Sequence, residues 1–312
     1  MNLPRIPIGE AVDSGVDWIT TNLAAFLDAI SDLLSFLVNG LTDLLLIPPE
    51  FVAIVLLTLL AVAMRSVTFG VFTLIATLLV ASMEMWEMAM ETLSLVLVAT
   101  VIALVIAIPL GILAARKNAV STVVRPVLDF MQTMPAFVYL VPVVAFFGIG
   151  VAPGVCATIV FAMAPGVRLT ELAIRQVDKE TVEAGEAFGG TPGQILRGIQ
   201  LPLGLPTIMA GVNQVIMLAL SMAVIAGMVG AGGLGSEVVN GVSRQDIALA
   251  FEAGLAVVVL AIFLDRITGA IGQPTGKSVP ALIRRKRAES ARRQADAEQA
   301  AAPQSAPSTT AA

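Results

Sequence analysis

The chain has 312 residues, of which 57% are hydrophobic and 13% are charged, and its formal net charge is -5. Soluble globular chains carry about a quarter of charged residues, so this composition excludes that class and indicates an all-α integral membrane protein. The absence of histidine and the single cysteine, Cys156, exclude His-ligated metal sites, Ser-His catalytic triads and intrachain disulfides.

The first 47 residues have the spacing of an amphipathic helix. Apolar side chains recur at steps of three and four, and aspartates lie off this stripe. The segment lacks a basic start followed by a continuous apolar core, so we expect no cleavable signal peptide. Its polar face is acidic, whereas helices that lie on a membrane surface usually have a basic polar face. We therefore predict that residues 1–47 form an extracytoplasmic segment packed on the outer face of the same protein.

Seven apolar runs approach the roughly 20 residues that cross a bilayer. We place these spans at about 48–64, 66–83, 92–115, 126–148, 153–174, 204–229 and 248–268. Only Arg65 and Ser66 separate the first two runs, which form either a tight helical hairpin or one long kinked segment. The predicted organisation is therefore two additional helices over 48–90, followed by a membrane core over 91–270.

Basic residues collect in alternate predicted loops. One side of the membrane receives most of them, and the other side has only Arg5 and Arg244, together with Glu84, Glu87 and Glu91. Because short cytoplasmic loops are enriched in lysine and arginine, we expect the N-terminus outside and the C-terminus in the cytoplasm of a bacterial inner membrane. The tail 271–312 is predicted to be cytoplasmic, and its composition from about 284 favours disorder.

Two glycine-rich stretches imitate nucleotide-binding motifs. Residues 230–235 satisfy G-x-G-x-x-G, but they follow an apolar helix of spanning length, whereas the dinucleotide fold requires a strand there. Residues 272–278 resemble a phosphate-binding loop, yet only three residues separate the glycines where G-x-x-x-x-G-K-S needs four. We expect no cofactor on this chain, and any ATP must bind another subunit.

The stretch 175–203 is too long for a simple connection between spans. It predicts one short helix at Lys179–Phe188, a break at Gly189-Gly190, and a second short helix. Thr191 suits the N-cap of that second helix and Pro192 its first position. Pro202 limits it at the other end.

This loop carries a long motif. Glu183, Ala184 and Gly185 are followed by Gly189 and then by Ile199-Gln200-Leu201-Pro202. The pattern resembles the E-A-A-x-x-x-G-x9-I-x-L-P signature of ABC importer permeases. Gly185, in place of the second alanine, is the one departure, and it keeps the surface small.

Two further segments narrow the resemblance. Residues 126–150, with the run D-F-M-Q-T-M-P-A-F-V-Y-L-V-P, and residues 201–221 closely resemble the permeases of glycine betaine and proline betaine importers. The glycines of 232–235 match as well. The resemblance covers about 90–270, extends more weakly into 48–90, and includes neither the first 47 residues nor the tail.

The resemblance implies the permease fold of a type I importer. Two copies of this chain would form the pathway, and two cytoplasmic subunits would bind ATP and Mg. A substrate-binding protein outside the membrane would deliver the solute. The loop 175–203 would then couple ATP hydrolysis to transport by rigid-body movement, and Glu183 would fix the loop through hydrogen bonds or a salt bridge.

Polar side chains inside the apolar spans are the candidates for the translocation pathway, although such residues also serve as hydrogen bonds between membrane helices. Quaternary ammonium groups are usually held by aromatic cages, and this chain has two tryptophans and one tyrosine. We therefore expect the selective site on the binding protein. The candidate pathway residues are Gln132, Thr133, Tyr139, Asn213, Gln214 and Ser221.

Three classes of function are compared. The first is the betaine-type permease, with permeases for amino acids, choline or carnitine as its neighbours. The second is an ion-coupled secondary transporter, which needs ionisable residues at mid-membrane; the spans 92–115 and 204–229 have none before their ends. The third is a membrane enzyme, for which the sequence offers no catalytic nucleophile paired with a general base. We expect a transport subunit that is not an enzyme.

Overall fold

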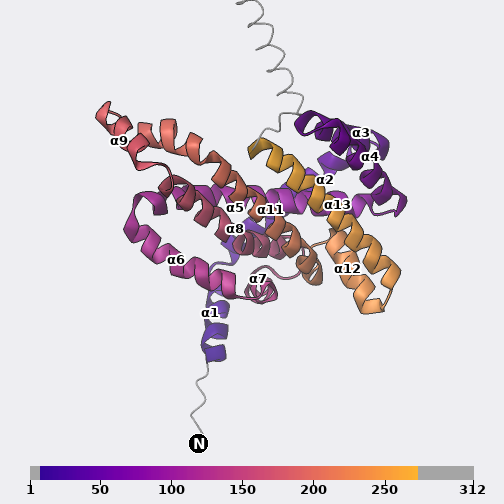
Figure 1. The fold of residues 1–312 in the computed structure, drawn as a ribbon. Helices are drawn as coiled ribbons and strands as arrows, with labels where there is room; N and C mark the ends of the chain where they lie inside the picture. The colour runs from indigo at the N-terminus through magenta and orange to yellow at the C-terminus, as the bar shows by residue number, and fades with distance from the viewer. Residues whose placement is uncertain (1–7, 273–312) are drawn as a thin grey trace, which may run out of the picture.

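The computed structural model describes residues 8–272 as a bundle of helices, and no strand occurs in that range (Figure 1). The all-α class predicted from the composition is confirmed. The predictions for the tail beyond Gly272, including disorder from about 284, lie outside the described residues. In chain order the elements are α1 (Ile8–Asn22), α2 (Ala24–Leu46), α3 (Glu50–Met64), α4 (Val67–Ser82), α5 (Trp86–Arg116), α6 (Asn118–Thr133), η1 (Ala136–Tyr139), α7 (Leu140–Phe147), α8 (Val151–Arg175), α9 (Lys179–Ala187), α10 (Pro192–Ile195), η2 (Leu196–Gln200), α11 (Leu201–Ala226), η3 (Gly227–Val229), α12 (Gly233–Arg244) and α13 (Ile247–Gly272).

Five segments in the described part of the chain are long and apolar enough to cross a membrane. Four of them, α5, α8, α11 with its flanking turns, and α13, coincide with predicted spans. The fifth is α2, which lies in the segment predicted for the outer face and which also qualifies as a span by its length and composition. No charged residue lies between Asp32 and Asp43, and this uncharged stretch gives α2 the composition of a span. The N-terminal segment is also divided into two helices, which meet at Leu23.

The first two predicted spans are a hairpin of short helices, α3 and α4. With 15 and 16 residues, each is about 23 Å long, against a hydrocarbon core of about 30 Å. Ser66 caps α4 by accepting a hydrogen bond from the Phe69 N–H at 3.3 Å. Gly70 allows α4 to approach Val62 closely, since a Cβ there would lie 2.1 Å from Val62 Cγ2. The hairpin alternative is therefore the correct one.

The predicted span 126–148 is not a single straight helix. α6 and the segment η1–α7 meet at an angle of 110°. Pro135 lies at the bend, and a proline disfavours helical geometry in the residue before it. Met134 accordingly has an extended backbone, with φ -74° and ψ 134°. If α6 and η1–α7 together form one broken span, the number of spans rises to six.

The centre of the bundle is built from α5, α8 and α11 (Figure 1). Small residues allow these helices to lie unusually close, as is common in membranes. A Cβ on Gly111 of α5 would lie 2.6 Å from Thr170 Cβ on α8, and one on Gly204 of α11 would lie 3.0 Å from the Ala173 carbonyl oxygen. The close contact at Gly111 and Thr170 makes α5 and α8 a tightly packed pair.

A glycine-rich turn connects α11 to α12. Gly230, Gly232 and Gly233 all have positive φ values, between +65° and +82°. The turn lies between two helices, and the helix that precedes it stands where a dinucleotide-binding unit has a strand. Side chains of α5 fix the start of α12: Glu91 Oε2 accepts a hydrogen bond from the Gly233 N–H at 2.7 Å, and Thr92 Oγ1 accepts one from the Leu234 N–H at 2.8 Å.

Candidate functional site

The predicted loop between α8 and α11 folds into two short helices, α9 and α10. Asp178 caps α9 by accepting a hydrogen bond from the Glu180 N–H at 3.2 Å. Thr191 and Gln194 form a capping box at the start of α10, with Pro192 at its first position. The capping roles predicted for Thr191 and Pro192 are confirmed.

The break between α9 and α10 depends on glycine. Gly189 has a φ of +79°, which residues with a side chain rarely adopt. The N–H groups of Gly189 and Gly190 donate to the carbonyl oxygens of Glu186 and Gly185 at 2.8 and 3.0 Å. A Cβ on Gly190 would lie only 2.7 Å from the Gly185 carbonyl oxygen, so the backbone of this turn leaves no space for a side chain at position 190.

The structure brings together two motif residues that are distant in sequence. Gly185 of α9 faces Ile199 of η2, and a Cβ on Gly185 would lie 2.6 Å from Ile199 Cδ1. The departure from alanine at this position therefore gives the isoleucine side chain room. Leu201 and Pro202 begin α11, which places them where the loop joins the bundle.

A π-helical turn, η2, connects α10 to α11. The N–H of Leu201 donates to the carbonyl of Leu196, five residues earlier. Wide turns of this kind are rare and occur often at functional sites. The sequence analysis did not predict this π-helical turn. Pro202 was a signal for it, because a proline has no N–H to continue the regular pattern of α-helical hydrogen bonds.

The loop presents an exposed surface at one extremity of the protein, where α9 projects beyond the ends of α5 and α8 (Figure 1). Glu183 and Ala184 are exposed, and Phe188 is 94% exposed. Glu183 forms no ion pair or hydrogen bond within residues 8–272. It lines a groove of about 310 Å³ that lies between α9, the end of α8 and Gln200.

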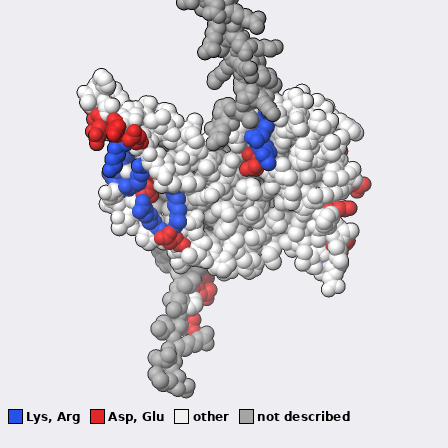
Figure 2. Space-filling model, viewed as in Figure 1, with Lys and Arg blue, Asp and Glu red and all other residues white. Residues whose placement is uncertain are grey.

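Charged side chains gather next to this loop. Figure 2 shows acidic residues at the projecting end, with a group of basic residues beside them around a hollow. A pocket of about 270 Å³ there is lined by Arg125 of α6 and by Arg168 and Arg175 of α8, together with Asp129 and Glu171. This end of the protein therefore has a far higher density of charge than the apolar middle of the spans.

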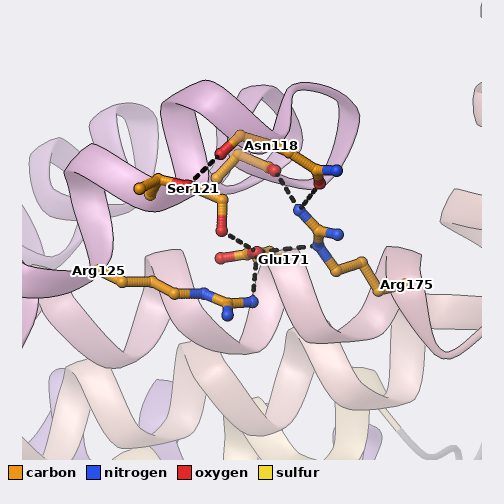
Figure 3. Close-up of polar contacts among 7 residues, drawn as sticks. Asn118, Ser121, Arg125, Glu171 and Arg175 are labelled. Atoms are coloured by element: carbon orange, nitrogen blue, oxygen red, sulfur yellow. Dashed lines mark hydrogen bonds and ion pairs between the residues drawn. The ribbon is translucent and has the colours of Figure 1, made fainter.

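One carboxylate in this cluster is buried. Glu171 lies within α8, and its side chain is only 4% exposed. Its Oε1 accepts hydrogen bonds from Ser121 Oγ at 2.8 Å and Arg125 Nη2 at 2.8 Å, and pairs with Arg175 Nε at 2.9 Å (Figure 3). Sequence reasoning missed Glu171, although an acidic residue inside an apolar span is itself a signal of function.

The same cluster extends to the end of α5. Arg175 Nη2 donates to Asn118 Oδ1 at 3.0 Å (Figure 3). It also donates to the carbonyl oxygen of Ala114 at 2.8 Å. Arg175 is the last residue of α8. The end of α5, the start of α6 and the end of α8 are therefore joined through two side chains, Glu171 and Arg175.

The candidate pathway residues fall into separate environments. Gln132 and Thr133 are exposed at the end of α6, next to the bend. Gln214 and Ser221 are exposed on one face of α11, at helical spacing. These four side chains remain accessible on the surface of the single chain.

The other two candidates point into the bundle. Tyr139 is buried, donates its hydroxyl hydrogen bond to the Met131 carbonyl and packs edge-on against Phe161. Asn213 faces α13, where Gly269 approaches its Nδ2. Both side chains have the environment of a contact between helices, and the structure does not bring the six candidates together within one chain.

Comparisons with known proteins agree on one family. The family model described as "Binding-protein-dependent transport system inner membrane component" matches residues 107–275. The glycine betaine transport system permease protein OpuAB of Bacillus subtilis is 48% identical over 266 residues, which cover 85% of this chain and 94% of the relative. The glycine betaine/proline betaine transport system permease protein ProW of Escherichia coli K12 is 47% identical, with 86% of this chain and 76% of the relative covered.

A third relative and a solved structure extend the comparison. The glycine betaine/carnitine transport permease protein GbuB of Listeria monocytogenes is 46% identical, with 87% of this chain and 98% of the relative covered. An inward-facing structure of the MetNI methionine ABC transporter matches 59% of this chain and 92% of its own, with a TM-score of 0.55 and 22% identity. At that identity the match establishes similarity of fold.

Proposed function

The chain belongs to the family of binding-protein-dependent transport system inner membrane components, and we propose that it carries glycine betaine, proline betaine or a related compatible solute into the cell. It is the permease subunit of an ABC importer, a multi-pass membrane protein, and ATP is hydrolysed on a separate subunit. The substrate class rests on the names of relatives that are close to half identical over most of this chain.

The exposed loop α9–α10 is the observation that carries the mechanism. Phe188 is 94% exposed at the end of α9, and a large apolar side chain left in water at a projecting tip is typical of a surface that contacts another protein. The Gly189-Gly190 turn behind it is closed by backbone hydrogen bonds. A firm projection with an apolar tip suits a docking element for the ATPase subunit.

A binding-protein-dependent importer works with an ATPase and a substrate-binding protein. The complete assembly that we propose has two copies of this chain and two ATPase subunits, which hold ATP and Mg. The loop 175–203, with its motif residues Glu183 to Pro202, would dock on the ATPase in the cytoplasm. The N-terminus would then lie outside and the C-terminus inside, as the distribution of basic residues favours.

Substrate selection belongs, in this proposal, to the binding protein. Trp86 and Tyr139 are buried in different hydrophobic clusters, and Trp18 is exposed on α1. These aromatic side chains do not form a cage for a quaternary ammonium group. The exposed polar residues Gln132, Thr133, Gln214 and Ser221 are the best candidates for the pathway, because a second copy of the chain can cover them and leave a polar route.

Reconstitution tests the function. The chain would be co-expressed with its ATPase subunit, purified as a complex and placed in liposomes with the substrate-binding protein outside. We expect ATP-dependent uptake of radiolabelled glycine betaine, and loss of uptake when the ATPase is replaced by a variant that cannot hydrolyse ATP. Failure of any ATPase subunit to co-purify, or uptake that depends on an ion gradient instead, would contradict the proposal.

A further inference from the structure

α6 is attached to α8 by apolar and by charged side chains. Ser121 and Leu128 are the buried residues of α6, and Leu128 lies in an apolar cluster with Ala164 and Val167 of α8, against which Val124 and Met131 of α6 also pack. Two ion pairs of opposite sense connect the helices one turn apart: Arg125 on α6 with Glu171 on α8, and Asp129 on α6 with Arg168 on α8. By contrast, α5 lies against α8 through the close contact of Gly111 with Thr170. The two ion pairs therefore add polar constraints to the apolar contact between α6 and α8.

Glu171 is the centre of this attachment. It receives Ser121 and Arg125 from α6 and Arg175 from its own helix, all on Oε1 and all within 2.9 Å. Burying an ion pair costs desolvation, and apolar residues of similar size often give equal or greater stability. Such a network instead fixes one arrangement of the helices, since displacing α6 would leave a buried carboxylate short of partners.

The network lies between the two parts of the molecule that transport must connect. Arg175 ends α8, and Asp178, which caps α9, follows three residues later. Arg175 also lines the groove beside α9. At its other end, α6 leads through Thr133 into the bend at Pro135. The base of the loop and the start of α6 thus meet at Glu171.

We propose that Glu171 is a positioning residue that carries movement of the loop α9–α10 to α6 and to the bent segment η1–α7. This inference rests on the proposed function, because it assumes that an ATPase moves the loop. When α8 and the loop turn as one body, the carboxylate keeps α6 in register with α8 and the bend follows. Without the charge, α6 no longer has to follow, and the loop moves without opening or closing the pathway.

The test uses Glu171→Gln in the reconstituted complex, with Arg125→Gln as a second variant. Glutamine keeps the size of the side chain and its contact with Ser121 but removes the ion pairs. Arg125 is 59% exposed, so its replacement leaves Glu171 paired with Arg175 and spares the buried core. Asp265→Asn is the matched control, since Asp265 forms an exposed ion pair with Arg266 on α13.

Two cysteine reporters separate positioning from stability. In a background where Cys156 is replaced by alanine, one cysteine is placed at Thr181 on α9 and another at Thr133 at the end of α6. Maleimide reactivity is compared between the nucleotide-free and vanadate-trapped states. In the wild type and in Asp265→Asn we expect both reporters to change. In the two test variants we expect Thr181 to change as before and Thr133 to stay constant.

Uptake per ATP hydrolysed is the second readout. A coupling free energy in the usual range corresponds to about fivefold or more, so we expect that ratio to fall by at least fivefold in both variants, while binding-protein-stimulated hydrolysis persists. Arg125→Lys, which keeps the positive charge opposite Glu171, should retain both the ratio and the Thr133 change.

Contrary outcomes are distinct. If both variants keep the wild-type ratio and the Thr133 change, Glu171 does not position α6 and the inference is overturned. A loss of coupling in Arg125→Lys as large as that in Arg125→Gln has the same meaning. If the wild-type complex shows no binding-protein-stimulated hydrolysis, the proposed function itself fails and this inference falls with it.

Discussion

A Cβ added to Gly185 would lie 2.6 Å from Cδ1 of Ile199, the far end of a flexible side chain. Gly190, in the same loop, meets a different kind of neighbour, because a Cβ added there would lie 2.7 Å from the backbone carbonyl oxygen of Gly185. A side-chain tip can rotate away, whereas the backbone of a closed turn cannot. The two glycines of one loop should therefore differ in their tolerance of alanine.

We expect Gly185→Ala to keep uptake within about twofold of the wild type, because Ile199 can adjust its rotamer at small cost. Gly190→Ala should reduce uptake by about fivefold or more, in line with about 1–3 kcal/mol for overpacking a closed turn. Both variants are measured for glycine betaine uptake in liposomes. Equal behaviour of the two variants would show that the turn geometry is not what the ATPase requires.

Phe188→Ala should weaken binding of the ATPase subunit. Aromatic residues at the centre of an interface contribute about 2 kcal/mol or more, so we expect its dissociation constant to rise by about 30-fold, and Phe188→Leu to have a smaller effect. Binding is measured on the permease in nanodiscs. Phe251→Ala is the control, since Phe251 is 69% exposed on α13. A Phe188→Ala variant with unchanged affinity would place the docking surface elsewhere.

Gly189→Asp should abolish coupling between substrate delivery and ATP hydrolysis. No atom lies within 4 Å of a Cβ at Gly189, so a side chain there has space in the free chain. The harm done by a side chain at this position must therefore come from the φ of +79° or from a clash with the docked ATPase. Asn tolerates this backbone region better than most residues. Failure of Gly189→Asn as well would assign the effect to docking. Gly198→Ala, also with open space, should keep near-normal stimulated hydrolysis.

The orientation of the chain can be tested by labelling. With Cys156 replaced by alanine, a cysteine at Asn22 near the end of α1 should react with impermeant maleimide added to intact cells. A cysteine at Thr181 on α9 should react only after the membrane is permeabilised. Both positions are exposed in the structure. The reverse pattern would place the loop outside the cell and remove its proposed role in contacting the ATPase.

The sequence was sufficient where the determining interactions are local. Apolar runs of spanning length identify α5, α8, α11 and α13. In a bilayer each of these segments must hydrogen-bond its own backbone N–H and C=O groups, and a helix does so with residues that are close in sequence. The caps of α9 and α10 were readable in the same way. Thr191 and Pro192 act within one turn of their own helix, and the glycines at 189 and 190 mark a turn that closes within five residues.

Prolines show where local information ends. Pro109 and Pro165 lie inside the continuous helices α5 and α8, whereas Pro135 lies at a bend of 110°. The residue type is the same, so the surroundings decide. Gly111 and Gly166, close to the first two prolines, are packed against neighbouring helices, which hold the backbone helical. Gln132 and Thr133, just before the bend, are exposed, and little packing opposes the break there.

Glu171 shows the same limit for the site. In the sequence it is one carboxylate near the end of an apolar span. Its partners Arg125 and Ser121 are 46 and 50 residues away, and only the packing of α6 on α8 brings them within hydrogen-bonding distance. Composition and motif alone predicted that the chain is a membrane permease and marked the loop between α8 and α11. The tertiary structure decided which side chains connect that loop to the rest of the bundle. An ion pair depends on the distance between two charges in the folded protein, and their separation in the sequence does not give that distance.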